Sequence, residues 1–424
     1  MTLTVVVGVN WGDEGKGRMV DYLARQADFV IRFQGGSNAG HTIVNEFGTH
    51  KLHLVPSGIF NPGVVNLLGP GTVVNLQAAV EEIESLRTRG ISIGPDNYKI
   101  SNRATICFPF HRLQDEYEEE RLGAKSFGST RQGIAPVYGD RYMKYSIQVG
   151  ALLYPEYLKQ EIIRCLSLKN KLLTQVYNQS AVDPEEAFSW AMHYGNILAP
   201  HIYDSIVLLK DADRSGKRVL LEGQLGALRD IYYGIYPYST SSSTLGSFGV
   251  VGAGCFDRKT PDIIGVMKTF STCIGEGPFV TEIKDSLANQ IRETSFEYGA
   301  ATGRPRRIGW FDAAASGYGA YVSSAHEIAL TKLDSLAGIN PLKICIAYAV
   351  NNKQMFEFPV MPELAMAAPV YIEMPGWEED ISGVRSFDNL PENTRNYVLR
   401  LEGLVGLPVK YISVGPSRDA MIIR

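Results

Sequence analysis

The feature that most constrains the fold is the N-terminal segment, where a strand, a glycine loop, a helix and a strand follow in direct succession. Residues 2–9 are a continuous apolar, β-branched run, which is typical of a strand buried on both faces of a parallel sheet. Residues 16–26 carry an apolar helical stripe, and residues 27–34 return to a strand pattern. This order predicts a βαβ unit and therefore an α/β fold.

Further elements support the same architecture. Residues 76–89 predict a helix that Asn75 caps and Gly90 ends. Further strands are predicted at 219–221, 328–330, 343–350 and 409–414. No repeat or long linker interrupts the chain, and its 42 glycines fall mostly in short loops. We therefore expect one large domain over residues 1–424, with a mostly parallel central sheet and helical and loop elaborations, similar to P-loop NTPases.

Composition excludes several classes of protein. The net charge of −4 gives no bulk attraction to nucleic acid or to anionic membranes, so neither is an expected partner. The five cysteines are scattered without a C-x-x-C motif, which predicts buried free thiols in a reducing compartment. The N-terminus lacks a basic signal-peptide region, and no apolar run reaches membrane-spanning length. We expect a cytoplasmic protein.

Residues 114–121, QDEYEEER, carry a dense run of charge. Such a run within a helical pattern is typical of a helix face in contact with solvent. We therefore expect this segment to form a helix with one face exposed to solvent.

The first loop, GVNWGDEGKG at residues 8–17, departs from the Walker A pattern, because Asn10 and Gly17 stand where glycine and a hydroxyl residue belong. Glycine backbone, Lys16 and the helix N-terminus still suit an anionic phosphate. Asp13 offers the hard oxygen ligand that Mg²⁺ prefers, and it is also a candidate general base. The alternative is an ordinary strand-to-helix turn whose acidic residues cap the helix.

The second loop, QGGSNAGHT at residues 34–42, also follows a predicted strand. Its glycines permit close backbone approach, while Asn38, His41 and Thr42 offer polar groups to a ligand. A single histidine is more often structural than catalytic. A histidine in a glycine loop that faces another glycine loop with Asp and Lys is a stronger candidate.

Two later motifs suit nucleotide and carboxylate recognition. In TKLD, Asp334 can accept from the N1–H and N2–H₂ groups of guanine together, and Lys332 can lie along the base; a helix start is the alternative. In ATGRPRR, the forks of Arg304, Arg306 and Arg307 suit bidentate binding of carboxylates, with a basic surface loop as the alternative.

The two glycine loops together resemble those of adenylosuccinate synthetase, a family that begins with W-G-D-E-G-K-G and then Q-G-G-x-N-A-G-H-T. The resemblance covers essentially the whole chain. It continues through YPYSTSSST (236–244), GEGPFVTEI (275–283), EYGAATGRPRRIGWFD (297–312), LTKLDSL (330–336), MPGWEEDISGVRSF (374–387), LPENTRNYV (390–398) and VKYISVGPSRD (409–419).

The resemblance implies a ligase that couples L-aspartate to IMP with GTP and Mg²⁺ through a 6-phosphoryl intermediate. Asp13 matches the base that removes the N1 proton of IMP, and it binds Mg²⁺ with the carbonyl of Gly40. His41 and Lys16 match residues that support phosphoryl transfer. A carboxylate then belongs beside phosphates because Mg²⁺ screens its charge.

The resemblance also implies three sets of binding residues. The GTP set is Gly12, Glu14, Gly15, Lys16, Gly17, Gly40, His41, Thr42, Arg306, Lys332, Asp334, Ser413, Val414 and Gly415. The IMP set is Asp13, Asn38, Thr130, Lys144, Gln224, Leu225, Arg229, Thr240 and Arg304. The aspartate set is Ala300, Ala301, Thr302, Gly303, Arg304 and Arg306. A homodimer is implied, with Lys144 reaching the neighbouring site.

The departures from the family pattern cluster on the IMP side. The family reads E-G-A-Q-G-T-L-L-D where residues 222–230 read EGQLGALRD, so Leu225 replaces the glutamine that addresses the 6-oxygen and Arg229 replaces a leucine. T-G-R-G-I-G-P appears as TRQGIAP at residues 130–136, with Arg131 and Gln132 changed. Lys144 and Cys273 stand where the family has arginine.

Three hypotheses follow from these departures. In the first, the altered pocket compensates, through Gln224 or Arg229, and IMP is the acceptor. In the second, the chain activates another oxo-heterocycle or nucleotide by the same GTP chemistry. In the third, the chain is a non-catalytic GTP-binding protein, which the presence of Asp13, Lys16 and His41 disfavours.

Overall fold

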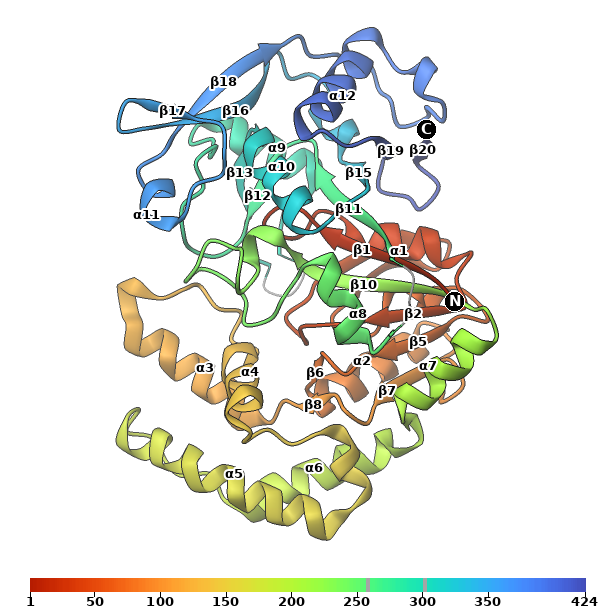
Figure 1. Cartoon of the computed structure of the whole chain (residues 1–424), viewed down its shortest axis with the longest axis vertical. Helices are drawn as coiled ribbons and strands as arrows, with labels where there is room; N and C mark the ends of the chain where they lie inside the picture. Colours follow the sequence, from red (N-terminus) through yellow and green to blue (C-terminus); the bar gives the residue numbers. More distant parts are fainter. Residues whose placement is uncertain (257–259, 300–302) are drawn as a thin grey trace.

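A ten-stranded sheet forms the centre of the computed structural model, which describes residues 1–424 except 257–259 and 300–302 (Figure 1). Neighbouring strands run parallel except at one edge, where β20 is antiparallel to β19. The predicted mostly parallel α/β fold is therefore confirmed. The strand order is β20 (Met421–Ile423), β19 (Val409–Ser413), β15 (Glu327–Thr331), β11 (Asp262–Lys268), β1 (Thr2–Gly8), β10 (Arg218–Gly226), β2 (Phe29–Arg32), β5 (Val65–Leu68), β7 (Tyr98–Ser101), β9 (Ile202–Tyr203).

The predicted N-terminal βαβ unit is present as β1, α1 (Lys16–Ala24) and β2. Its two strands are not adjacent, because β10 lies between them and pairs with both. On its other side, β1 pairs with β11. Strand β1 is therefore a central strand, buried on both faces and paired along both edges. Because β1 and β10 are parallel neighbours, their carboxyl ends lie side by side, and residues about two hundred positions apart meet in one site.

The predicted helix after Asn75 and the predicted strand at residues 343–350 are both present, although the strand lies outside the central sheet. Helix α2 (Leu76–Thr88) begins at Asn75, whose side chain accepts a hydrogen bond from the backbone N–H of Ala78 at 3.1 Å. Residues 343–350 form a strand, but it belongs to a second sheet rather than the central one. That sheet consists of β14 (Phe311–Asp312), β16 (Leu342–Val350), β17 (Lys353–Met355) and β18 (Ala368–Met374).

The remaining elements extend the central sheet at both ends of the view in Figure 1, where α3 to α6 gather at the bottom and α12 and the second sheet at the top. None of the helices in the described part of the chain has the length and apolar character needed to cross a membrane. The helices are α3 (Pro109–Leu122), α4 (Ile134–Met143), α5 (Pro155–Gln175), α6 (Pro184–Leu198), α7 (Ser205–Arg214), α8 (Gly246–Ala253), α9 (Ser286–Ser295), α10 (Ala313–Val322), α11 (Met361–Leu364) and α12 (Glu392–Val405). Short strand pairs complete the fold: β3 (His41–Asn45) with β4 (Gly48–Leu52), β6 (Val73–Val74) with β8 (Thr105–Ile106), and β12 (Ser271–Cys273) with β13 (Arg307–Gly309).

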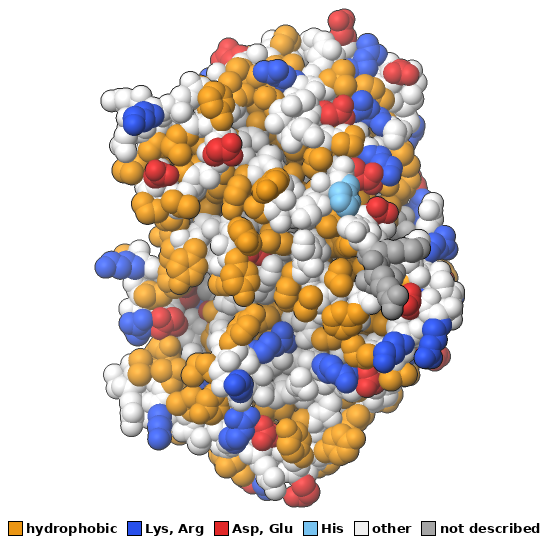
Figure 2. All heavy atoms as spheres, viewed as in Figure 1, with side chains coloured by type: hydrophobic (Ala, Val, Ile, Leu, Met, Phe, Trp, Pro, Cys, Tyr) orange, Lys and Arg blue, Asp and Glu red, His pale blue; other side chains and the backbone are white. Residues whose placement is uncertain are grey.

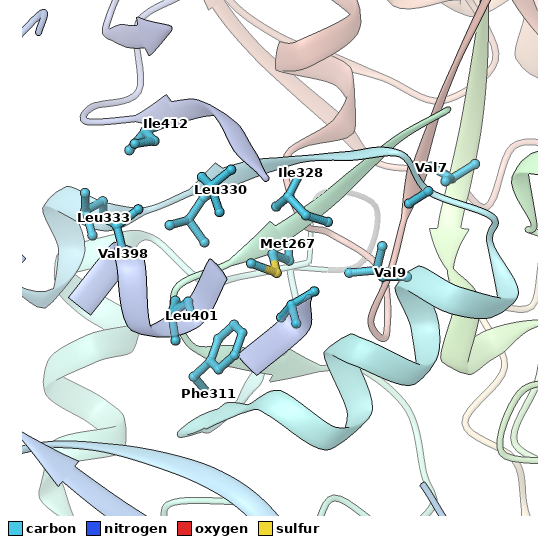
Figure 3. Packing of buried hydrophobic residues seen from close by; sticks show 14 of the residues in the cluster. Val7, Val9, Met267, Phe311, Ile328, Leu330, Leu333, Val398, Leu401 and Ile412 are labelled. Atoms are coloured by element: carbon cyan, nitrogen blue, oxygen red, sulfur yellow. The ribbon is translucent and has the colours of Figure 1, made fainter. Parts of the chain in front are cut away.

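The largest core cluster lies between the central strands and the helices that cover them. Figure 3 shows Met267 of β11 and Leu330 of β15 facing Val398 and Leu401 of α12. All four side chains are almost completely buried, so this packing fixes α12 against the strands whose ends carry the site. All five cysteines are buried thiols, as predicted.

Helix α10 approaches the start of the first glycine loop so closely that one of its positions has no room for a side chain. A Cβ added at Gly319 would lie 1.7 Å from the backbone oxygen of Val9. At Gly317, in the same helix, an added Cβ meets nothing within 4 Å. The backbone contact at Gly319 therefore sets the position of α10 against the end of β1.

Gly319→Ala is expected to lower the free energy of unfolding by roughly 1–3 kcal/mol or more, because the added methyl overpacks a backbone contact that cannot yield. Gly317→Ala is the matched control and is expected to raise it by up to about 1 kcal/mol through helix propensity. Urea unfolding measures both. Equal effects of the two substitutions would contradict this account of the packing.

Candidate active site

The first glycine loop is held together by a carboxylate of its own. Glu14 accepts hydrogen bonds from the backbone N–H groups of Asn10 and Gly12, at 3.2 and 2.8 Å, and pairs with the ammonium of Lys16 at 2.5 Å. Gly15 has φ 101° and precedes Lys16, the first residue of α1. The Glu14 side chain is only 2% exposed, so it stabilises the loop from inside, and Lys16 at the start of α1 lines the cavity described below. Contact of Glu14 with GTP remains a prediction.

Asp13 is the carboxylate of this loop that faces the cavity. Its side chain is 28% exposed and lies 3.0 Å from the Nε of Arg306. Arg306 also pairs with the buried Glu297, which in turn binds the ammonium of Lys268 at 2.7 Å. Burial lowers the pKa of Lys268 to about 8, whereas Lys268 and Arg306, against the effect of burial, hold the pKa of Glu297 at about 2. Glu297 is therefore charged at neutral pH and keeps Arg306 beside Asp13.

His41 begins β3 and is fixed by Glu222 of β10. Its Nδ1 lies 2.5 Å from a Glu222 oxygen, and Glu222 also accepts from the backbone N–H of Ser57 at 2.8 Å. A carboxylate can only accept, so Nδ1 carries the proton and Nε2 is left to meet a ligand. Burial lowers the pKa of His41, and Glu222 opposes that effect.

The close approach of His41 to Gly17 explains why this loop has glycine where a Walker A motif has a hydroxyl residue. A Cβ added at Gly17 would lie 2.6 Å from the Cβ of His41, so a serine or threonine cannot stand there while His41 keeps its place. The histidine of the second loop thus occupies the space that the hydroxyl residue takes in a Walker A motif.

A cavity of about 710 Å³ adjoins both glycine loops. Among the predicted residues, its lining includes Gly12, Asp13, Lys16, Asn38, Gly40, His41, Thr130, Gln224, Leu225, Arg229, Thr240 and Arg304. The structure thus brings most of the predicted IMP set together with the predicted catalytic residues, although these residues are spread from position 13 to position 304 of the sequence.

The loop that carries Thr130 is held by two acidic residues of α3, and the prediction of a fully solvated face for residues 114–121 was wrong for both. Glu119 accepts from the backbone N–H groups of Phe127, Gly128 and Ser129 at 2.9–3.0 Å. Asp115 accepts from the Ser129 hydroxyl and the Gly133 N–H. Their spacing of four residues, which puts them on one helix face, is the signal that would have found them.

Leu225 and Gln224 point to different sides of the end of β10. Leu225, at φ 57°, lies against Gly12, with its Cα 3.2 Å from the place of a Cβ there. Gln224 is 1% exposed and binds the side chains of Arg32 and Asn38. The left-handed backbone at Leu225 breaks the regular alternation of the strand, so the two side chains contact different loops, and the Leu225 side chain brings no hydrogen-bond donor to the cavity.

Arg229 forms a clamp across the loops of the acceptor side. Its two terminal nitrogens donate to the backbone oxygens of Tyr238, Ile274 and Glu276, and one of them lies 2.9 Å from the sulfur of Cys273. The side chain is 7% exposed. Because these donors are used within the protein, Arg229 positions the cavity wall and does not itself supply the donor that position 225 lacks.

Three other altered positions lie away from this chain's acceptor cavity or at its margin. Lys144, at φ 66°, lines a second cavity of about 550 Å³ with Arg103 and Arg164. Arg131 turns outward to pair with Glu116 at 3.1 Å. Gln132 accepts from the hydroxyl of Ser37 at 3.3 Å, which ties the Thr130 loop to the second glycine loop.

The predicted guanine-side residues gather at the ends of β15 and β19, outside the lining of the acceptor cavity as far as the structure describes the chain. The hydroxyl of Thr331 donates to the carbonyl of Glu14 at 2.6 Å, which joins the TKLD segment to the first loop. Arg18 of α1 donates to the Ser413 hydroxyl and to Ala420. Burial raises the pKa of Asp334. Lys332 follows β15 directly, and Val414 and Gly415 follow β19.

The predicted aspartate loop is described only in part. Ala300, Ala301 and Thr302 lie outside the described residues. Gly303 and Arg304 are exposed, and the carbonyl of Arg304 accepts from the N–H of Gly299 at 2.8 Å. Thr42 is exposed on β3, on the opposite side of the strand from His41.

A phosphate-binding loop at the end of a central parallel strand, with a cavity-facing carboxylate, defines an α/β enzyme class that activates an acceptor with a nucleoside triphosphate. A family model described as adenylosuccinate synthetase matches residues 5–422. The chain belongs to the adenylosuccinate synthetase family of GTP-dependent ligases. The family resemblance of the sequence is therefore confirmed.

Known relatives span the full length of the chain. It is 43% identical over 424 residues to an adenylosuccinate synthetase of Caldanaerobacter subterraneus subsp. tengcongensis, covering 100% of this chain and 99% of the relative. It is 46% identical to adenylosuccinate synthetase 2 of Pseudoalteromonas translucida, covering 100% of both. The structure of fully ligated adenylosuccinate synthetase from Plasmodium falciparum matches with a TM-score of 0.93 at 34% identity, again over 100% of both chains.

Arg229→Leu is expected to raise the KM for the acceptor by roughly 10-fold and to lower the free energy of unfolding by about 1–3 kcal/mol, because three loop carbonyls lose their donor. The KM for GTP should stay unchanged. Adding Cys273→Arg should restore both values, because a guanidinium from position 273 starts beside the same carbonyls. Steady-state kinetics and urea unfolding test this, and a double variant no better than Arg229→Leu would contradict the clamp.

Proposed function

We propose that this chain ligates L-aspartate to IMP with GTP, giving adenylosuccinate, GDP and phosphate through a 6-phosphoryl-IMP intermediate. The observation that carries the proposal is that one cavity is lined both by Asp13, Lys16 and His41 and by the loops of Thr130 and Thr240. A nucleotide acceptor there has its heterocycle beside the phosphate loop and its phosphate beside hydroxyl groups.

The residues around the phosphate loop divide the work of phosphoryl transfer. Asp13 takes the N1 proton of IMP, which pushes negative charge onto the 6-oxygen and makes it the nucleophile. Lys16 and the N-terminus of α1 neutralise the charge of the transferred phosphoryl group. His41 is oriented by Glu222 through Nδ1, and its Nε2 donates to the phosphoryl group when that nitrogen is protonated. Phosphoryl transfer depends mainly on such positioning and charge neutralisation.

Mg²⁺ fits this donor set. It is commonly held by one or two protein oxygens together with substrate phosphates and water. The carboxylate of Asp13 and the carbonyl of Gly40 both adjoin the cavity, and they are the residues that would hold the ion. Bound there, Mg²⁺ supplies charge neutralisation between the carboxylate and the phosphates.

Arg306 links the aspartate site to the base. Without substrate it neutralises Asp13, while Glu297 holds its other end. A carboxylate of L-aspartate offers the same guanidinium a bidentate partner. Arg306 therefore exchanges Asp13 for substrate, together with Arg304 and the 300–303 loop, and releases Asp13 for its work with IMP and Mg²⁺.

The acceptor site is completed by a second copy of the chain. Lys144 does not line its own chain's acceptor cavity but a second one, with Arg103 and Arg164. Nearby aromatic side chains, Tyr142, Tyr154 and Tyr157, are between 55% and 68% exposed, which suits an interface. Figure 2 shows hydrophobic side chains spread over much of one face, with charged side chains along its margins and also among them in the lower half. We place the homodimer in the cytoplasm, where the five buried thiols stay reduced.

Asp13→Asn is expected to reduce ligation by at least roughly 10²–10⁴-fold, because the amide can neither take the N1 proton nor balance the metal charge. Asp211→Asn, a change on the exposed surface of α7, is the matched control. Phosphate release with GTP, IMP and aspartate measures the activity, and circular dichroism confirms folding. Near-normal ligation by folded Asp13→Asn would remove Asp13 from the mechanism.

Asp334→Asn is expected to shift nucleotide use from GTP towards XTP, because the amide N–H₂ can donate to the 2-oxo group of xanthine. The ratio of kcat/KM for the two nucleotides measures the shift. An unchanged preference for GTP in the variant, or a preference for ATP in the wild type, would show that TKLD does not read the base.

A further inference from the structure

A buried chain of three polar side chains leads from the interior to the acceptor cavity. Arg32, which is 1% exposed, donates to the Oε1 of Gln224. The Nε2 of Gln224 donates to the Oδ1 of Asn38 at 3.0 Å, and the backbone N–H of Gly36 donates to the same oxygen at 3.2 Å. Asn38 is half-buried and adjoins the cavity, so the chain ends at the substrate.

The polarity of this chain has only one solution. A guanidinium and a backbone N–H can donate but not accept, so Arg32 must face the oxygen of Gln224 and Gly36 must face the oxygen of Asn38. Gln224 then presents its N–H₂ group to Asn38. With both bonds on Oδ1, the Nδ2 of Asn38 is the polar atom turned towards the cavity, and within the described part of the chain it has no hydrogen-bond partner.

The backbone makes room for this arrangement. Gly35 has φ 73°, and a Cβ added there would lie 1.0 Å from the Nε2 of Gln224. Any side chain at position 35 would therefore displace the amide of Gln224. The second glycine loop is shaped around Gln224 as well as around a ligand.

We propose that Gln224 is a positioning residue that locks the amide of Asn38 so that its Nδ2 donates to a negatively charged oxygen of the acceptor. The inference rests on the proposed function and concerns the same cavity. The positive charge of Arg32 polarises the hydrogen bonds from Arg32 through Gln224 to Asn38, which strengthens the Nδ2 of Asn38 as a donor. Leu225 brings no donor to the cavity and the donors of Arg229 bind loop carbonyls, so Asn38 is the amide that this wall offers to substrate.

Gln224→Glu tests the polarity directly. A carboxylate at position 224 would face the Oδ1 of Asn38, oxygen against oxygen, while the N–H of Gly36 still requires that oxygen. Neither orientation of the Asn38 amide then satisfies both neighbours, so its Nδ2 is no longer held towards a ligand. The kcat/KM for IMP is expected to fall roughly 10²-fold, with the KM for GTP unchanged. Gln224→Met, which keeps the volume without enforcing the wrong polarity, should cost only about 10-fold.

Asn38→Ala separates positioning from general structural damage. If Gln224 acts through Asn38, Gln224→Glu should cost less than about 3-fold in the Asn38→Ala background. An equal loss in both backgrounds, or a Gln224→Glu enzyme with wild-type kinetics, overturns the proposal. Should Gln224→Glu not fold, Asn38→Asp keeps both incoming hydrogen bonds but has no donor, and wild-type use of IMP by that variant overturns it equally.

A comparison of IMP with inosine identifies the oxygen. If Gln224→Glu lowers kcat with inosine as well as with IMP, the contact is to the carbonyl of the heterocycle. If Gln224→Glu only raises the KM for IMP, the contact is to the phosphate. Both results support the lock. Wild-type enzyme that ligates neither acceptor would instead contradict the proposed function, so the two failures remain distinct.

Discussion

The buried carboxylate of Glu14 is the interaction on which the site depends. It satisfies two backbone N–H groups of the first loop and the ammonium of Lys16, and so gives a glycine-rich segment a single conformation. The neighbouring strands make room for it, since a Cβ added at Gly8 or Gly226 would lie 2.3–2.4 Å from its oxygens. Two adjacent acidic residues of the loop therefore differ in place: Glu14 holds the loop together from inside, and Asp13 lines the cavity.

Buried ion pairs then orient the groups around this loop. Glu222 of β10 directs His41 at the start of β3, in a distant part of the chain. Glu297 directs Arg306, which follows it by nine positions. Removing one member of such a pair leaves an uncompensated buried charge, typically at a cost of roughly 3–5 kcal/mol. Such pairs add little net stability, and their main effect here is to hold His41 and Arg306 at defined positions.

The acceptor side shows how one pocket accommodates several substitutions at once. Arg229 spans the loops of Tyr238 and Ile274 from the position where the family has leucine, while Cys273 stands where the family has arginine. Gln224 occupies space that Gly35 leaves and engages Asn38. The changed residues contact one another's loops, which is why they must be interpreted together and not position by position.

The sequence by itself determined the local features: the buried strand, the cap at Asn75, and the two glycine loops that carry Asp13, Lys16 and His41. These depend on neighbours along the chain and on a resemblance in continuous motifs. Tertiary structure decided that β10 lies between β1 and β2, that Asp115 and Glu119 hold a substrate loop, and that Gln224 engages Asn38 while Leu225 faces Gly12. Each of those outcomes depends on which remote backbone groups come within hydrogen-bond reach, and strand order in a parallel sheet is set by packing between segments far apart in sequence.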